Sequence, residues 1–326
     1  MKKVLIAILL LGLLPHASAD YIHWVDFRLS APVLRSALEL DMASQGGEQP
    51  LDWIDILALA AAWRGGTGVT VADTQRAAQV LRGDTPPERL PGMAGRYFSY
   101  YREAYGAALG GLAGHFAIRR TDPQTGEAEW IPAYGLKAFS PIAAGYPWSH
   151  YPDFGAQRSY GYARPHLGND ILGALGTPIC AVEGGTVEAL GWNRYGGWRI
   201  GIRSDDRKRY YYYAHLRKDT PYAEGLAVGQ RVQAGEVIGF MGRTGYSAQE
   251  NVNNIETVHL HFGLQLIFDE SQKECDSEIW IDVYPIVELL ASHCSSVARD
   301  PQTGRWERLY PYCDLDAEPL RSAAAR

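Results

Sequence analysis

Hydrophobic residues recur with helical spacing in the first third of the chain and with alternating spacing beyond it. Four segments carry apolar residues three or four positions apart, as one face of a helix requires: 31–44, 50–63, 72–83 and 96–111. In the first segment the apolar stripe consists of Val33, Leu34, Ala37, Leu38 and Met42. We therefore expect a small N-terminal helical domain over residues 20–115.

The pattern of hydrophobic and polar residues changes after the helical segments. Residues 116–132 contain two alternating runs around an Asp-Pro turn, which predicts a β-hairpin. From there to Leu266, short β-rich segments alternate with glycine-containing turns, so we expect a mainly antiparallel β domain over residues 116–268. The tail, 269–326, contains one further helical pattern at 283–292. The expected fold class is α+β, with more than one domain.

The first 19 residues (1–19) have the pattern of a secretory signal peptide. Two lysines precede an apolar run at 4–14, and Ala17-Ser18-Ala19 has the small residues of a cleavage site. The apolar run is short for a membrane anchor, and no later stretch reaches about 18 uninterrupted apolar residues. We expect a secreted or cell-envelope protein, outside the cytoplasm and without stable membrane insertion after cleavage.

The composition and net charge of the chain limit the functions that we expect. The 326-residue chain is 46% hydrophobic, which is enough for a full core. It has 37 acidic and 31 basic side chains and a formal net charge of −6, and loss of Lys2 and Lys3 with the signal peptide would make it more acidic. Because nucleic-acid binding depends largely on neutralising phosphates, we do not expect it here.

The four cysteines lack the CxxC spacing of zinc-thiolate sites. They are Cys180, Cys275, Cys294 and Cys313. Export would permit a disulfide, for which Cys294 and Cys313 are the preferred pair. Cys180 has the setting of a buried residue in a strand.

The candidate chemistry lies in three histidine clusters of the expected β domain. The segment "VHLHFG" places His259 and His261 on one face of a strand, since side chains alternate. "RPHLGNDI" supplies His166 and Asp170, and "YYYYAHL" supplies His215. A catalytic zinc ion takes three protein ligands. His166, Asp170 and one histidine of the pair provide such a set, and two histidines remain for proton transfer and oxyanion stabilisation.

These motifs resemble the lysostaphin/LytM-type zinc metallopeptidases, a family of peptidoglycan endopeptidases with a compact, largely antiparallel β fold. The family pattern is HxxxD, then a strand ending in AHL, then HLH. Here it reads "HLGND", "YYYYAHL" and "VHLHF", in the same order. Glycine-rich phrases around the motifs also match, and the resemblance covers residues 139–266.

The resemblance implies a role for each residue of the clusters. The zinc ligands would be His166, Asp170 and His261, and the catalytic pair His215 and His259. The implied reaction is hydrolysis of peptide bonds in the stem or cross-bridge of peptidoglycan, with Zn²⁺ as the cofactor and peptidoglycan peptides as the partner.

Three other roles are compatible with the sequence, and two further predictions concern the groove around the histidines. The chain could be a non-catalytic envelope scaffold or regulator of other wall hydrolases, with the helical domain binding an envelope protein partner. The helical domain could instead cover the groove as an inhibitory segment, or a metal site could serve stability only.

Tyr211 and Tyr213 are placed on the face of His215, where cross-strand packing is favoured over substrate contact. The polar segment 248–257 is expected to form a loop at the groove rim that shapes substrate choice.

Overall fold

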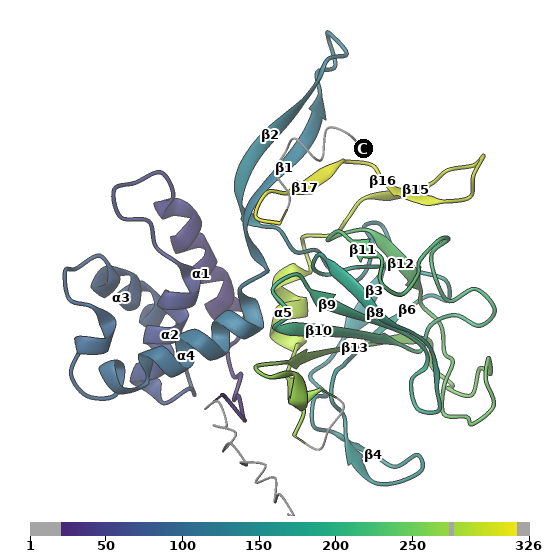
Figure 1. Cartoon of the computed structure of the whole chain (residues 1–326), viewed down its shortest axis with the longest axis horizontal. Helices are drawn as coiled ribbons and strands as arrows, with labels where there is room; N and C mark the ends of the chain where they lie inside the picture. Colours follow the sequence, from purple (N-terminus) through teal and green to yellow (C-terminus); the bar gives the residue numbers. More distant parts are fainter. Residues whose placement is uncertain (1–20, 274–276, 318–326) are drawn as a thin grey trace, which may run out of the picture.

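The structure, a computed structural model, describes residues 21–273 and 277–317 (Figure 1). Its N-terminal part is helical, and the four predicted helices are confirmed. Their bounds are Ala31–Ser44 (α1), Trp53–Arg64 (α2), Val71–Leu81 (α3) and Met93–Leu109 (α4), with a 3₁₀ helix at Pro87–Arg89 (η1). The expected signal peptide lies outside the described residues, and no helix within them is long and apolar enough to span a membrane.

Two of the helices begin at residues that cap them. The Asp52 side chain accepts a hydrogen bond from the Ile54 N–H at the start of α2, and Thr70 and Asp73 form a capping box at the start of α3. These side chains satisfy N–H groups that have no partner inside the helix. Helix α2 is rich in alanine and leucine and is buried on nearly all sides, so it is the central helix of this part.

The apolar stripe of α1 differs from the prediction at one position. Its other four residues are buried, but Met42 is 43% exposed, so its assignment to the stripe is wrong. Asp41 is buried instead, because its Oδ2 accepts hydrogen bonds from the Trp53 N–H (3.1 Å) and the Tyr134 hydroxyl (3.0 Å). A polar group can be buried there because it is fully bonded.

The β-rich part is built around an eight-stranded sheet, in which neighbouring strands pair antiparallel, as expected. Its order is β11-β8-β9-β10-β13-β6-β3, and β14 also pairs with β13. The strands are Trp148–His150 (β3), Asn169–Gly173 (β6), Gly185–Asn193 (β8), Gly197–Ser204 (β9), Arg209–Ala214 (β10), Arg231–Val232 (β11), His259–Leu266 (β13) and Ile279–Ile281 (β14). The α+β class is therefore confirmed.

Smaller elements surround this sheet. Three two-stranded sheets pair Gln157–Arg158 (β4) with Arg164–Pro165 (β5), Pro178–Cys180 (β7) with Val237–Phe240 (β12), and Val297–Arg299 (β15) with Trp306–Arg308 (β16). A 3₁₀ helix lies at Glu270–Gln272 (η2).

The predicted hairpin is confirmed, but it lies outside the main sheet. Its strands are Ala113–Thr121 (β1) and Ala128–Leu136 (β2), which project from the body of the molecule (Figure 1). The outer edge of β1 pairs with Tyr312–Asp314 (β17), a strand of the C-terminal tail. The tail therefore completes a separate three-stranded sheet with the hairpin.

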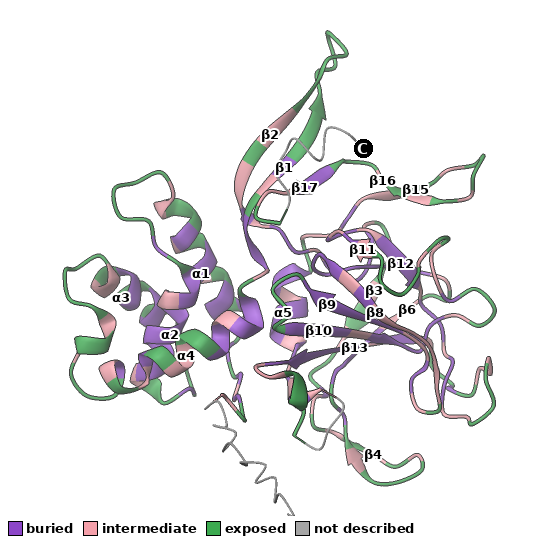
Figure 2. Ribbon diagram, viewed as in Figure 1, coloured by how far each residue is buried: buried purple, intermediate pink, exposed green. Residues whose placement is uncertain are grey.

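The helical and β-rich parts are packed together. The helix predicted in the tail is present at Tyr284–Leu290 (α5), contacts α1 and lies between the helical part and the sheet (Figure 1). The buried Arg209 guanidinium of β10 donates a hydrogen bond to the Ala107 carbonyl of α4 (2.7 Å) and pairs with Glu183 (2.7 Å). One hydrophobic core extends through both parts, as the buried residues in Figure 2 show.

The cysteines do not form the preferred disulfide. Cys294 and Cys313 are not bonded to each other, and the Cys294 Sγ lies 3.3 Å from the Ala291 carbonyl oxygen. That prediction is wrong in this structure, because proximity across the fold, which sequence spacing does not define, decides which cysteines can meet. Cys180 is buried in β7, as predicted, and burial raises the pKa of its thiol to about 12. Cys275 lies outside the described residues.

Candidate metal centre and active site

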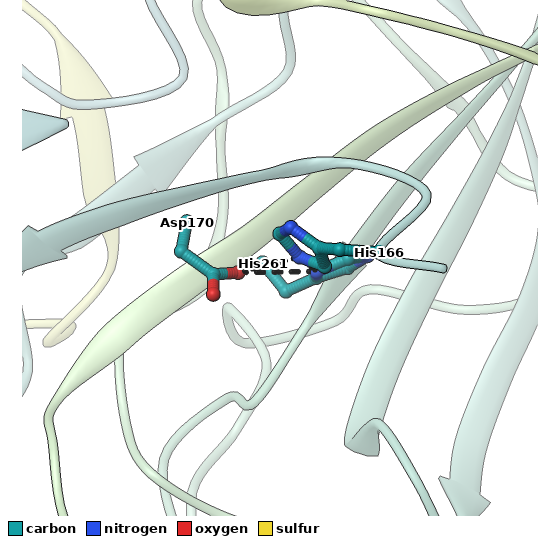
Figure 3. Close-up of side chains that lie close together, drawn as sticks. All are labelled: His166, Asp170 and His261. Carbon is teal, nitrogen blue, oxygen red and sulfur yellow. Dashed lines mark hydrogen bonds and ion pairs between the residues drawn. The ribbon is translucent and has the colours of Figure 1, made fainter. Parts of the chain in front are cut away.

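Three side chains converge beside the main sheet (Figure 3). His166 precedes β6, Asp170 lies on β6, and His261 lies on the neighbouring strand β13. His166 Nε2 lies 2.8 Å from His261 Nδ1 and 3.0 Å from Asp170 Oδ1, and His261 Nδ1 lies 3.2 Å from the same oxygen. Two imidazole nitrogens and a carboxylate oxygen directed at one point form a donor set that fits a zinc ion.

Strand register and a glycine bring these groups together. Because β13 pairs with β6, His261 stands directly opposite Asp170. Gly168 lies two residues before Asp170, and a Cβ added there would lie 2.6 Å from His261 Cε1 and 2.7 Å from the Phe262 carbonyl oxygen. No other residue could pass this close to the histidine without displacing it.

Asp153 supports the donor set from behind, and sequence reasoning missed it. Its Oδ2 and its carbonyl oxygen each lie 3.1 Å from His166 Nδ1, so the Nδ1 hydrogen points at Asp153 and Nε2 at the cluster. Burial by itself would lower the pKa of His166, but Asp153 and Asp170 outweigh it and raise the pKa to about 9. Burial is likewise outweighed at Asp170, where hydrogen bonds from His166 and His261 hold the carboxyl pKa well below its usual range. The pocket therefore favours positive charge at its centre.

Two further histidines stand beside the cluster. His215 Nδ1 lies 2.9 Å from the Thr244 carbonyl oxygen, and His259 Nδ1 lies 2.9 Å from the Thr257 carbonyl oxygen. Each ring thus donates its Nδ1 hydrogen to a backbone carbonyl, and its Nε2 lies on the opposite side of the ring, away from that carbonyl. The two ring centroids are 4.7 Å apart, and His259 Nε2 lies 3.7 Å from Asp170 Oδ1. The five residues singled out in the sequence therefore meet at one place.

The tyrosines of β10 alternate differently from the prediction. His215 has φ +62°, and β10 ends just before it, so the regular alternation of faces stops there. Tyr210 and Tyr212, rather than Tyr211 and Tyr213, consequently line the same cavity as His215. Tyr211 and Tyr213 are buried in the core, which confirms the favoured cross-strand packing.

The site opens into a cavity of about 320 Å³. Aromatic and cationic side chains line it beside the donor set; they include Tyr195, Tyr246, Trp280, Arg158, Arg164 and Arg199. The lining residues lie between positions 158 and 280, so none comes from the helical part. The interpretation of that part as a cover over the groove is therefore not supported. The polar segment 248–257 also contributes no lining residue, although the neighbouring Tyr246 does.

Comparisons with known proteins agree with these features. The model of Peptidase family M23 matches residues 164–274. An L-Ala--D-Glu endopeptidase of Bacillus subtilis is 40% identical over 130 residues, which is 40% of this chain and 38% of that protein. Lysostaphin of Staphylococcus staphylolyticus is 37% identical over 98 residues (30% and 18%), and the peptidoglycan DD-endopeptidase ShyC of Vibrio cholerae is 30% identical over 102 residues (31% and 20%).

The chain therefore spans less than two fifths of the length of each of these relatives. The matched segment nevertheless contains the donor set and both neighbouring histidines. From the order of the histidine motifs, their convergence on one cavity and the family match, we conclude that residues 164–274 form a peptidase family M23 domain of the lysostaphin/LytM type.

Proposed function

We propose that this protein is an exported, zinc-dependent endopeptidase that hydrolyses peptide bonds in the stem or cross-bridge of bacterial peptidoglycan. The observation that carries the proposal is the convergence of five side chains at one place: His166, Asp170, His215 and His261, which line the cavity, and His259, which lies against His215 and Asp170. The signal-peptide pattern at residues 1–19 supports export.

Zinc would be held by His166 Nε2, Asp170 Oδ1 and His261 Nδ1. When bound, it supplies Lewis-acid chemistry, in which it polarises a carbonyl and lowers the pKa of water. Two groups outside the set keep the ligands oriented. Asp153 fixes the ring of His166, and Arg158 donates a hydrogen bond to Asp170 Oδ2 (2.9 Å), which leaves Oδ1 for the ion.

His215 and His259 would carry the proton chemistry. Because each Nδ1 hydrogen is committed to a backbone carbonyl, Nε2 can accept a proton from the attacking water and return it to the leaving amine. The second imidazole, when it carries a proton on Nε2, can donate a hydrogen bond to the oxyanion that forms on the scissile carbonyl. Their ring centroids are 4.7 Å apart, so both rings could reach the same peptide bond.

The bond that is cut follows from the groove rather than from the five side chains. The relatives are named for different bonds, L-Ala–D-Glu in one and a DD bond in another. A stem or cross-bridge peptide is the substrate class they share. The helical part, which leaves the cavity open, would be free to bind an envelope protein partner.

The decisive experiment is mass spectrometry of peptidoglycan digested by the zinc-loaded protein, using purified walls with several cross-bridge types. We expect new peptide termini that identify the bond. The termini should disappear after chelation and in His215→Ala. Asp122→Asn, in the exposed hairpin turn, is the matched control and should retain activity.

The same experiment tests the main alternative. If the protein binds zinc and peptidoglycan but releases no peptide from any wall, the proposal fails. The non-catalytic envelope scaffold or regulator would then be the better description.

A further inference from the structure

One cation in the cavity has no bonded partner. Arg199 of β9 is half-buried and lines the cavity, and its Nε is shielded from solvent without a hydrogen bond. Within the described residues its guanidinium forms neither a hydrogen bond nor an ion pair with the protein. Leaving a half-buried cation unpaired is unfavourable, so such a group is commonly completed by a ligand.

The other cations of the lining are already engaged. Arg158 pairs with Asp153 and with Asp170 of the donor set. Arg164 donates a hydrogen bond to a backbone carbonyl (2.6 Å) and packs on the ring of Tyr195 at 4.6 Å. Lys273 pairs with Glu188. Arg199 is thus the lining cation that is available to an anion from outside.

The sheet places Arg199 at a defined distance from the donor set. Ile200 is paired with Tyr213, so Arg199 falls beside Ala214, which stands directly opposite His261 on the next strand. Arg199 is therefore two strands from His261, a backbone separation of about 10 Å. An extended peptide advances about 3.3 Å per residue, so a group held by Arg199 lies within about three residues of the scissile bond.

We propose that Arg199 binds a carboxylate of the substrate peptide, and that the enzyme consequently prefers acidic stem peptides to neutral ones. The inference rests on the proposed function and narrows its substrate class. A guanidinium is suited to this task because its parallel N–H groups match the two oxygens of a carboxylate. The neighbouring aromatic side chains exclude water and strengthen the pairing.

The test compares two forms of one substrate. A cross-linked muropeptide dimer is used with all its carboxylates free, and again after conversion of every carboxylate to a primary amide. We expect the wild-type protein to have a kcat/KM about 10- to 100-fold higher for the free acid, the range for a charge-assisted hydrogen bond. Arg199→Gln should lower kcat/KM for the acid by the same factor and leave the amide within about twofold. Arg199→Lys should retain part of the preference, because lysine keeps the positive charge but lacks the two parallel N–H groups of the guanidinium.

Binding provides a second readout that does not require turnover. The Kd of each dimer is measured by calorimetry for the wild-type protein, for Arg199→Gln and for the control Arg194→Gln. Arg194 is an exposed arginine in the turn before β9 and does not line the cavity. Tighter binding of the acid that is lost only in Arg199→Gln supports the inference. Equal wild-type affinities or rates for the two dimers would overturn it, as would an equal loss for both dimers in a folded, zinc-loaded Arg199→Gln. If neither dimer is cleaved, the proposed hydrolysis fails, while the binding measurement still decides the role of Arg199.

Discussion

Asp153 and His166 form a carboxylate–imidazole pair, with Oδ2 of one 3.1 Å from Nδ1 of the other, on the side of the ring that faces away from Asp170. Asp153 lies in the loop before β4 and is buried. Its carboxylate fixes the tautomer of His166 and makes Nε2 more basic. Through this pair, the loop that contains Asp153 should influence how strongly the proposed metal site binds its ion.

Replacing this carboxylate should weaken metal binding. Asp153→Asn keeps the shape of the side chain but removes its charge, and we expect a zinc affinity about 10- to 100-fold lower, as for other groups that orient a ligand. Competition with a chromophoric chelator measures the change, with Asp122→Asn in the exposed hairpin turn as the control. An unchanged affinity in Asp153→Asn would show that the pair does not influence the ion.

Substitution of a proposed ligand histidine and of a proposed catalytic histidine should affect zinc binding differently. His166→Ala removes a donor atom, so we expect loss of stoichiometric zinc together with activity. His215→Ala should retain zinc and lose activity by about 10²- to 10⁴-fold, the usual contribution of proton transfer by a side chain. Metal analysis and peptidoglycan turnover on the same samples distinguish the two. Loss of zinc in His215→Ala would mean that His215 is a ligand.

Gly168 offers a steric test of the site. In Gly168→Ala the new methyl group would lie 2.6 Å from His261 Cε1, so the histidine or the loop must move. We expect lower zinc affinity and a loss of about 1–3 kcal/mol in the free energy of unfolding, as for other overpacked positions. Gly106→Ala is the matched control, since its nearest neighbour is 3.9 Å away. Urea denaturation of the metal-free proteins measures the stability, and equal values for the two variants would contradict the expected clash.

A buried lysine gives a pH-dependent prediction. Lys137 pairs with Asp314 (3.0 Å) and Asp316 (2.8 Å); burial would lower its pKa, but the two carboxylates outweigh burial and raise it above 10.5. Burial would raise the pKa of Asp316, but Lys137 outweighs it and lowers that pKa below 3.8. The two ion pairs therefore stabilise the folded protein fully between about pH 4 and about pH 10.5, where all three groups are charged in the folded and the unfolded chain. This stabilisation is lost as pH rises through the lysine pKa or falls through that of the aspartate.

The comparison with Lys137→Met makes this measurable. We expect the wild-type protein to be more stable than the variant at neutral pH, and the difference to shrink below about pH 4 and above about pH 10.5. Arg120→Met, on the exposed part of β1, is the control for a removed cation. A stability difference that stays constant from acid to alkaline pH would exclude the ion pairs as its source.

Local pattern predicted most of the helices, the hairpin and the three histidine clusters, because each depends on neighbours in the sequence. The predictions failed where a long-range contact or a single backbone angle determines the position of a side chain, because the local pattern does not contain either. The positive φ of His215 reverses which tyrosines share its face. Asp153 has no motif that marks it, since its partner is 13 residues away across a loop. Arg199 could be singled out only once the partners of every cation in the cavity were known.

The pairing of β17 with β1 also constrains the order of assembly. Phe116 stands opposite Asp314, so these two edges are separated by about 200 residues of chain, a contact of high order that forms slowly. The hairpin is synthesised before β17 and has one edge unpaired until β17 follows, and an unpaired edge is a site for wrong association. The strand that covers it follows about 200 residues later in the chain. Deletion of β17 should therefore cause aggregation through the hairpin before it affects the cavity beside the donor set.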